Sequence, residues 1–187
     1  MKKLLSRLSA VVLTGTVALF AAGCASTPEH YPPTENGVLA FKSIPGGRLI
    51  KTSMPGDYFK QDNELFRRLF RYLESHELTM TVPVVSTVGE ECSMAFYVLP
   101  SEKAKAGKNE ENVVVADVPE QLAAVYGFRG NNDAESWSKG VEEMKKLLQA
   151  HSEYEIAGAF YATYWDSPML PGFLRHYEIT VPVRKRK

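Results

Sequence analysis

The side chains best suited to chemistry lie near the end of the chain, in the stretch "YWDSPMLPGFLRHYEITVPV". Two strand-like runs flank a loop that holds two prolines and a glycine. This loop also carries three apolar residues, Met169, Leu170 and Phe173. Apolar side chains in a loop that cannot form regular structure are expected to cover something. The covered object is either the protein core or a bound ligand.

The second of these runs predicts a final strand, whose side chains alternate between two faces. Tyr177 and Ile179 share one face, and His176, Glu178 and Thr180 share the other. A carboxylate among apolar neighbours either faces solvent or supplies the polar point of a pocket. Residue type alone favours solvent, because most acidic side chains are exposed.

These residues belong to the second copy of a repeated unit. The segment "IPGGRLIKTSMPG" at 44–56 aligns without a gap with "VPEQLAAVYGFRG" at 118–130, an offset of 74 positions. Each copy is followed by an amphipathic pattern that predicts a helix, and each helix by two strand-like runs. The helices are expected over 62–75 and 133–150, with Asp62 and Asp133 as their N-caps.

The repeat predicts an α+β fold in which duplicated β-β-α-β-β units, at 38–100 and 112–183, form one domain over 37–183. Their strands would make a curved antiparallel sheet or distorted barrel with the two helices packed on one side. The other face of that sheet is left for side chains or a ligand. The hydrophilic segment 101–112 would link the halves, and 184–187 would be a basic tail.

Residues 1–23 predict a lipoprotein signal peptide. Lys2, Lys3 and Arg7 precede an apolar run that ends in "AAGC", so Cys24 is expected to carry the lipid. The alternative is a membrane-spanning helix, but the run is shorter than the ~20 residues that a bilayer needs.

The polar, proline-rich segment 24–36 predicts an extended tether outside the core. Ala25 follows the lipidated cysteine where an Asp would resemble the signal for retention at the inner membrane. We therefore expect a bacterial envelope protein that is anchored in the outer membrane and faces the periplasm.

Composition and motif content argue against several classes of function. The 22 Lys and Arg balance the 22 Asp and Glu, and loss of the three cations in the signal would leave the remainder mildly acidic, which argues against nucleic-acid binding. Of the two cysteines, Cys92 would lack an intrachain disulfide partner and is expected to be a buried thiol. The chain has no CxxCH, P-loop or GxSxG motif, and its histidines lack metal-site spacing.

Four stretches together resemble the SOUL haem-binding protein family over most of residues 38–183. They are "NELFRRLFRYL", "TMTVPV", "MAFYVLP" and the closing segment described above. The wider superfamily is similar to the effector-binding domains of multidrug-responsive regulators. In those domains a final-strand Glu faces the ligand cleft, and the matching residue here is Glu178.

The resemblance implies non-covalent binding of haem or a similar planar hydrophobic ligand. Haem needs an apolar slot, cations near its propionates and, optionally, an axial ligand to its iron. His76 and His176 are the candidate axial ligands, and no other metal is expected. The candidate ligand-binding residues are Arg67, Arg71, Tyr164, Trp165, Met169, Phe173, Arg175 and Glu178.

We therefore expect a monomeric, lipid-anchored haem carrier, buffer or sensor. One alternative is a small hydrolase that uses Glu178 with Tyr164 or Tyr161, since some relatives of the superfamily resemble such enzymes. Another is an envelope protein-interaction module that docks a partner on its apolar loop.

Overall fold

The computed structural model describes residues 32–166 and 170–187. The predicted signal peptide, Cys24 and Met169 lie outside these residues. The strands are β1 (Leu39–Ile44), β2 (Gly47–Pro55), β3 (Val84–Thr87), β4 (Glu91–Tyr97), β5 (Val114–Val118), β6 (Gln121–Arg129), β7 (Tyr154–Ile156), β8 (Tyr161–Tyr164) and β9 (His176–Lys185). The helices are α1 (Tyr58–Ser75) and α2 (Ala134–Leu148), and two 3-10 turns are η1 (Pro100–Glu102) and η2 (Gly172–Leu174).

The order strand, strand, helix, strand, strand occurs twice, which confirms the predicted α+β fold of duplicated units. Strands β2 and β6 occupy the two segments that align without a gap. One detail differs from the prediction, because the run "YEIAGAFYATYW" forms two short strands, β7 and β8, and not one.

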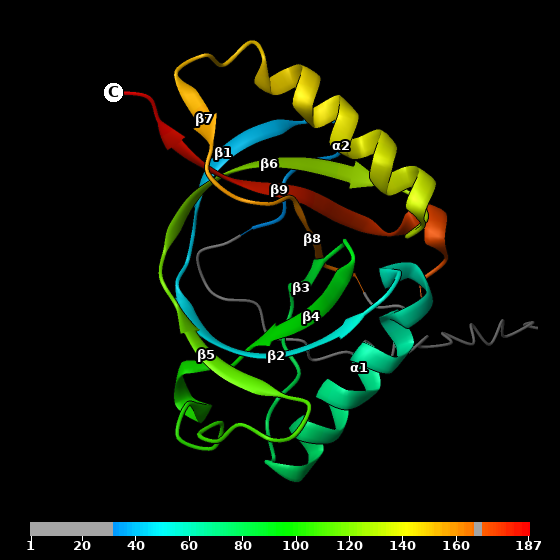
Figure 1. The fold of residues 1–187 in the computed structure, drawn as a ribbon, viewed down its shortest axis with the longest axis vertical. Helices are drawn as coiled ribbons and strands as arrows, with labels where there is room; N and C mark the ends of the chain where they lie inside the picture. The colour runs from blue at the N-terminus through cyan, green and yellow to red at the C-terminus, as the bar shows by residue number, and fades with distance from the viewer. Residues whose placement is uncertain (1–31, 167–169) are drawn as a thin grey trace, which may run out of the picture.

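The strands form one curled antiparallel sheet in the order β1-β6-β9-β8-β3-β4-β2-β5, with β7 paired to β9. The halves interleave, since β1 of the first half pairs with β6 of the second, and β5 of the second half pairs with β2 of the first. Figure 1 looks into this curl, with α1 and α2 outside it. The sheet therefore has a convex face under the helices and a concave face inside the curl.

Helix α2 begins where the sequence predicts, whereas α1 begins earlier than predicted. Asp133 is the N-cap of α2 as predicted, and its side chain accepts a hydrogen bond from Ser136 N at 2.8 Å. The predicted N-cap Asp62 is wrong, because α1 begins at Tyr58 and is capped by Asp57. Tyr58 is buried against the sheet and extends the apolar side of the helix by one turn toward the N-terminus.

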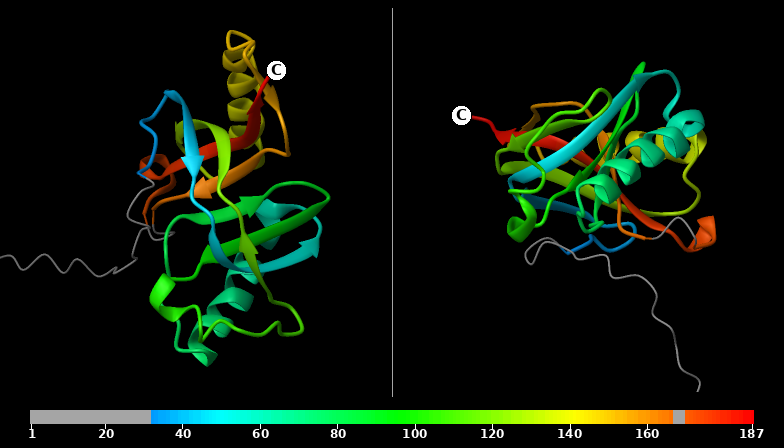
Figure 2. Two further views of the ribbon diagram at one scale, coloured as in Figure 1. Left: turned by 90° about the vertical axis from the view of Figure 1, so that its left-hand side faces the viewer. Right: turned by 90° about the horizontal axis from the view of Figure 1, so that it is seen from below.

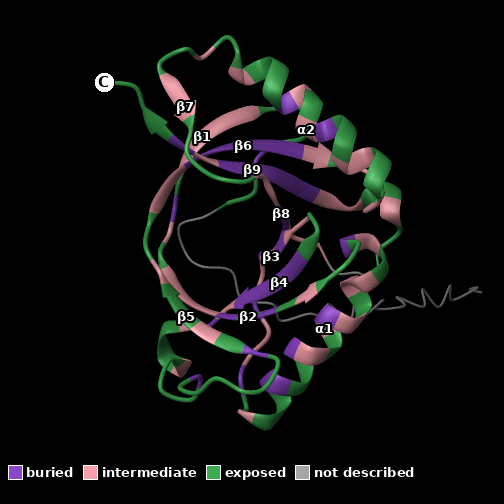
Figure 3. Ribbon diagram, viewed as in Figure 1, coloured by how far each residue is buried: buried purple, intermediate pink, exposed green. Residues whose placement is uncertain are grey.

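Two apolar clusters fill the space between the helices and the convex face. The first holds Leu65 and Leu69 of α1 against β2 and β4, and includes the buried Cys92 that the sequence predicts. The second holds Met144 of α2 against β6 and β9, including the fully buried Ile179. Figure 3 shows the buried residues concentrated in the middle of the strands and on the sheet side of the helices, and Figure 2 shows the helices against the outer surface from two further sides.

The last residues of the predicted tether belong to the domain, which corrects the expectation that 24–36 lies outside the core. Thr34 is buried, Asn36 forms a parallel bridge with Gly127, and Gly37 N donates to Gly127 O at 2.8 Å. The proline-rich composition is compatible with this, because an extended segment can pack on a sheet as readily as it can extend into solvent. Among the described residues no helix is long and apolar enough to cross a membrane.

Candidate ligand site

The concave face holds a cleft of about 250 Å³ between the two halves of the sheet. Its apolar walls are Ile44, Leu49, Val85, Val118 and Pro119, and its polar residues are Thr87, Tyr97, Gln121, Tyr161 and Thr163. These side chains come from both repeats, so the cleft exists only when the halves are joined. It lies on the face of the sheet that the repeat is predicted to leave for side chains or a ligand.

Two tyrosines place hydroxyl groups at this cleft. Gln121 Nε2 donates to Tyr161 Oη at 3.3 Å, and Tyr97 Oη lies 3.5 Å from the carbonyl of Pro45. Burial raises the pKa of both phenols above the usual value. Tyr97 and Tyr161 are therefore neutral at physiological pH and can each donate a hydrogen bond.

Glu178 lies beside the cleft on the same face, and it is fully buried. Thr34 N donates to its Oε1 at 2.5 Å, Trp165 Nε1 donates to its Oε2 at 2.8 Å, and the Lys42 ammonium lies 3.4 Å from Oε1. Residue type favours a solvent-facing carboxylate at this position, and that interpretation is wrong because Glu178 is buried.

The strand register relates Glu178 to the cleft. Glu178 of β9 is directly opposite Thr163 of β8, and Thr163 lines the cleft. Directly opposed residues of antiparallel strands point to the same face. Between the two regions, Trp165 packs on the small buried side chains of Ala123 and Val125.

Tyr164 points to the other face of the sheet. Its hydroxyl donates to Asn132 Oδ1 at 2.6 Å, and its ring stacks 6.3 Å from that of Tyr58 beneath α1. Tyr164 and Glu178 are therefore on opposite faces and cannot act on one substrate. Tyr161, the other tyrosine considered for hydrolysis, does share the concave face with Glu178.

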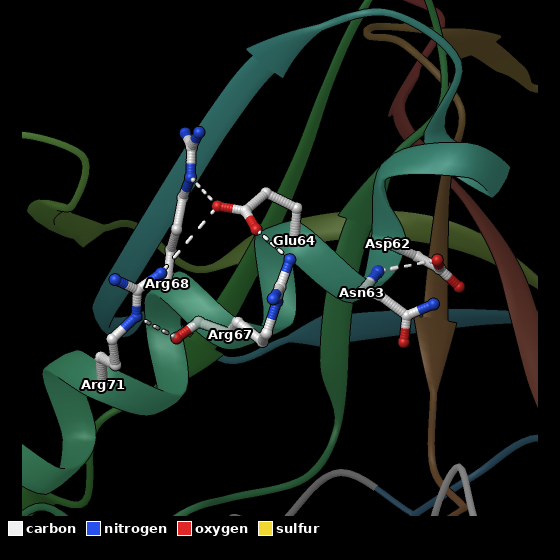
Figure 4. A network of polar contacts seen from close by, with 6 residues as sticks. All are labelled: Asp62, Asn63, Glu64, Arg67, Arg68 and Arg71. Carbon is white, nitrogen blue, oxygen red and sulfur yellow. Dashed lines mark hydrogen bonds and ion pairs between the residues drawn. The ribbon is translucent and has the colours of Figure 1, made fainter.

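Arg67 and Arg71 lie on the outer helix α1 and do not line the cleft. Figure 4 shows both side chains around Glu64, together with Arg68. The Glu64 carboxylate lies 2.6 Å from Arg67 and 3.0 Å from Arg68, and these cations, Arg68 foremost, hold its pKa below the usual value. An open cavity of about 500 Å³ lies beside this helix, but Glu110 and Glu111 line it together with Arg68 and Arg71.

The two candidate axial histidines have different surroundings. His76 closes α1, stacks 4.0 Å from the ring of Tyr72, and places Nε2 3.6 Å from Glu110 Oε1. His176 begins β9, where its main-chain N donates to Asp166 Oδ2 at 2.5 Å. Its ring Nε2 is buried and has no hydrogen-bond partner within the described ranges. Neither histidine lines the cleft, although His176 is on the same face of β9 as Glu178.

The described part of the apolar loop does not form a wall of the cleft. Phe173 is 69% exposed, and Leu170 and Leu174 are also exposed. Arg175 Nε donates to the carbonyl of Leu170 at 2.7 Å, which holds the turn closed. The structure therefore brings Trp165 and Glu178 together beside the cleft, and it places Phe173 and Arg175 on a separate projecting turn.

Haem fits this site only in part. Ligand pockets for drug-sized molecules span about 300–1,000 Å³, so the cleft of about 250 Å³ is too small to enclose a tetrapyrrole. A flat ring could enter by one edge between the apolar walls and leave its other edge in solvent. Among residues 32–166 and 170–187, no group of three His, Cys, Asp or Glu side chains is arranged to hold a metal ion.

Comparison with known proteins identifies the family. Residues 34–182 match the sequence pattern of the family described as SOUL heme-binding protein. The chain belongs to this family. The match begins at Thr34, so the SOUL domain includes the end of the segment that the sequence predicts to be a tether. No curated protein matches the chain.

Solved structures share the fold of this SOUL protein at low sequence identity. The crystal structure of the EcmrR C-terminal domain has a TM-score of 0.67 at 16% identity, covering 80% of this chain and 98% of that one. The cryo-EM structure of EcmrR in a DNA complex has a TM-score of 0.66 at 17% identity. The match covers 80% of the present chain but only 58% of the EcmrR chain. The crystal structure of a hydrolase from Listeria innocua has a TM-score of 0.55 at 12% identity, covering 82% of the present chain and 94% of the hydrolase chain.

Several residues of the site are absent from the set that sequence reasoning selects. Tyr97 and Gln121 line the cleft, and Lys42 and Thr34 contact Glu178. Alternation along β4 could have placed Tyr97 on the concave face. Lys42 and Thr34 carry no such signal, because their meeting with Glu178 depends on the pairing of distant strands.

Proposed function

We propose that this SOUL-family protein binds haem or a similar planar apolar molecule, non-covalently, in the cleft of the concave face. The observation that carries the proposal is the cleft itself, whose apolar walls come from both halves and surround a few polar groups. Burial of apolar ring surface supplies the affinity, at roughly 25 cal/mol per Å². The hydroxyls of Tyr97 and Tyr161 would orient the polar edge of the ligand.

A cation for a propionate or another anionic substituent is available near the cleft. Lys51 follows Leu49 by two positions in β2, so the two side chains leave the same face of the strand, about 7 Å apart. Leu49 lines the cleft and Lys51 is exposed. In this proposal Lys51 takes the role that Arg67 and Arg71 have in the sequence-based prediction.

Binding has more support than hydrolysis. A general base must present a lone pair to its substrate. Glu178 is fully buried, and Thr34, Trp165 and Lys42 already contact its oxygens. We propose that the protein acts as a carrier, buffer or sensor, and that it does so from a lipid anchor at Cys24 in the bacterial outer membrane.

A titration of the mature protein with ferric haem and with iron-free protoporphyrin tests the proposal. We expect saturable one-to-one binding of both, followed by the Soret band and by tryptophan quenching. Val118→Trp fills the cleft and should weaken binding of both ligands at least tenfold, an amount that loss of about 60 Å² of buried apolar surface explains. Ile156→Trp is the control, because Ile156 is an exposed residue of β7, lies opposite Val183 and does not line the cleft.

The iron-dependent part is tested with histidine variants. If His176 ligates the iron, His176→Ala should alter the Soret band of bound haem while leaving protoporphyrin binding unchanged; if His76 does, His76→Ala should have that effect instead. Unsaturable binding of both ligands, or equal binding by the Val118→Trp and Ile156→Trp variants, would refute the cleft as the site.

A further inference from the structure

Residues 32–37, called the strap below, cross the concave face next to the cleft and are held there by contacts along their length. Lys42 Nζ donates to the carbonyl of Pro32 at 2.7 Å, and Thr34 N donates to Glu178 at 2.5 Å. Gly37 N donates to Gly127 O at 2.8 Å, and Gly127 N donates to Val38 O at 3.1 Å. Thr34 is only 4% exposed, whereas the other five residues of the strap are exposed, so the strap is packed against the sheet at Thr34.

Gly127 makes room for the strap. It lies in β6 directly opposite Glu178 in β9. A Cβ atom at this position would collide with the carbonyl oxygens of Thr34 and Glu35. Because those oxygens belong to the backbone, a side chain at 127 could be accommodated only by moving the strap. The strap can therefore lie in this position only because residue 127 has no side chain.

The carboxylate of Glu178 provides the polar attachment point. A buried carboxylate without donors would cost several kcal/mol, and here the backbone N–H of Thr34 is one of its donors. The Lys42 ammonium contacts both Glu178 and the strap carbonyl of Pro32, so it ties the two together. The side-chain hydroxyl of Thr34 is buried with no partner within the described ranges, so only the backbone of Thr34 attaches to Glu178.

We propose that Glu178 is a latch for the protein's own strap and not a ligand-binding group, and that the strap limits the size of the cleft. The Glu178 region and the cleft are contiguous through Thr163, which lines the cleft and faces Glu178 across the strand pair. The closed strap confines a ligand to the Tyr97 and Tyr161 side. Its release extends the cleft toward Trp165 and admits more of a flat ring. The predicted change in ligand binding rests on the function proposed above, whereas the role of Glu178 in holding the strap rests only on contacts within the protein.

Two variants open the strap by independent routes. Thr34→Pro removes the backbone N–H that donates a hydrogen bond to Glu178. Thr34→Val is its control, because it keeps that N–H and replaces only the unpaired hydroxyl. Gly127→Ala places a methyl group against the strap backbone. Gly89→Ala is its control, because a Cβ there would meet nothing closer than 3.8 Å.

The first measurement is independent of any ligand. Hydrogen exchange at the amide of Gly37 should accelerate at least tenfold in Thr34→Pro and Gly127→Ala relative to their controls. In a Trp137→Phe background, which leaves Trp165 as the sole tryptophan, acrylamide should quench the fluorescence of both variants more strongly. Unchanged exchange and unchanged quenching in either variant would overturn the latch.

The second measurement uses protoporphyrin as the probe. The two opening variants should bind it about tenfold more tightly than their controls, as expected when about 60 Å² more of the ring is buried. Equal or weaker binding in variants whose strap is released would overturn the proposed limit on cleft size. Failure of every variant to bind protoporphyrin would refute the proposed function, and the exchange and quenching results would still decide the latch.

Discussion

At the scale of single residues, burial changes the acid–base chemistry of the tyrosines between the helices and the sheet. Burial raises the pKa of Tyr58 to about 12 and raises that of its neighbour Tyr164 as well. Tyr58 is 2% exposed and its ring stacks on that of Tyr164. Ionisation of either phenol would place a charge in the apolar layer that joins α1 to β8.

These tyrosines predict a loss of stability in alkali. In the unfolded chain a tyrosine ionises near pH 10, whereas folded Tyr58 keeps its proton until about pH 12. Unfolding between these values releases a proton, so the free energy of unfolding falls as the pH rises from 10 to 12. Tyr58 alone should remove about 1.4 kcal/mol by pH 11, measured by urea unfolding at pH 8 and pH 11. Tyr58→Phe should reduce this dependence, and an unchanged pH dependence in that variant would contradict the explanation.

Glu178 shows how far residue-level prediction can reach. Alternation in the final strand places it with His176 and Thr180, and resemblance to the family marks it as important. The chemical role of its carboxylate was not predictable, because its contacts Thr34 and Lys42 lie more than a hundred positions earlier in the chain. Trp165, although selected for the ligand, donates to this same carboxylate.

At the scale of elements, the start of α1 is set by a cap and by an apolar residue together. Asp57 accepts a hydrogen bond from Phe59 N at 3.1 Å, and Tyr58 packs into the core immediately after it. Asp62 lies within the helix and accepts from the adjacent Asn63 N. The amphipathic pattern predicted the helix itself, but it placed the N-cap at Asp62, five positions after the observed cap, because the pattern did not include Tyr58.

This difference between the aspartates is measurable. Asp57→Ala should lower the free energy of unfolding by about 1 kcal/mol, because it removes the N-cap. Asp62→Ala is the matched control and should change it by less than about 0.5 kcal/mol, as is usual for substitutions on the surface of a helix. Chemical denaturation of both variants at neutral pH decides the matter, and an equal loss in the two would mean that Asp57 does not act as the cap.

The repeated unit was the most predictable element-level feature. The gap-free alignment at an offset of 74 positions places β2 and β6 in equivalent positions, and the structure has both strands there. Strand order was not predictable from the same pattern. Period-2 alternation states which residues share a face, but it does not state which strand lies next to which.

At the scale of the whole molecule, the proposed lipid anchor at Cys24 lies close in sequence to the strap. Pro32, the first described residue, follows Cys24 by eight positions, and a chain of that length spans at most about 29 Å. A lipid on Cys24 would therefore keep Pro32, at the start of the strap, within that distance of the membrane surface. Such an arrangement suits a ligand that partitions into lipid.

Substitution of the anchor residue tests this placement. In a Gram-negative host, the unaltered protein should fractionate with outer membranes and incorporate labelled palmitate. Cys24→Ser should lose the label and leave the outer-membrane fraction, because a single missing lipid attachment removes the acyl chains that hold the protein. Ala25→Asp keeps the cysteine and should shift the labelled protein to the inner membrane. Outer-membrane fractionation of Cys24→Ser would show that attachment does not depend on this residue.

The interleaving of the two halves has a consequence for the biogenesis of the protein. The first strand, β1, pairs with β6, and β2 is flanked by β4 and β5, so neither repeat can close its own part of the sheet. Pairing between such distant segments is slow, because the chain must close long loops before the contacts stabilise it. A newly synthesised chain therefore stays open until β6 has been made. That delay would suit export of the chain in an unfolded state, which the predicted signal peptide requires.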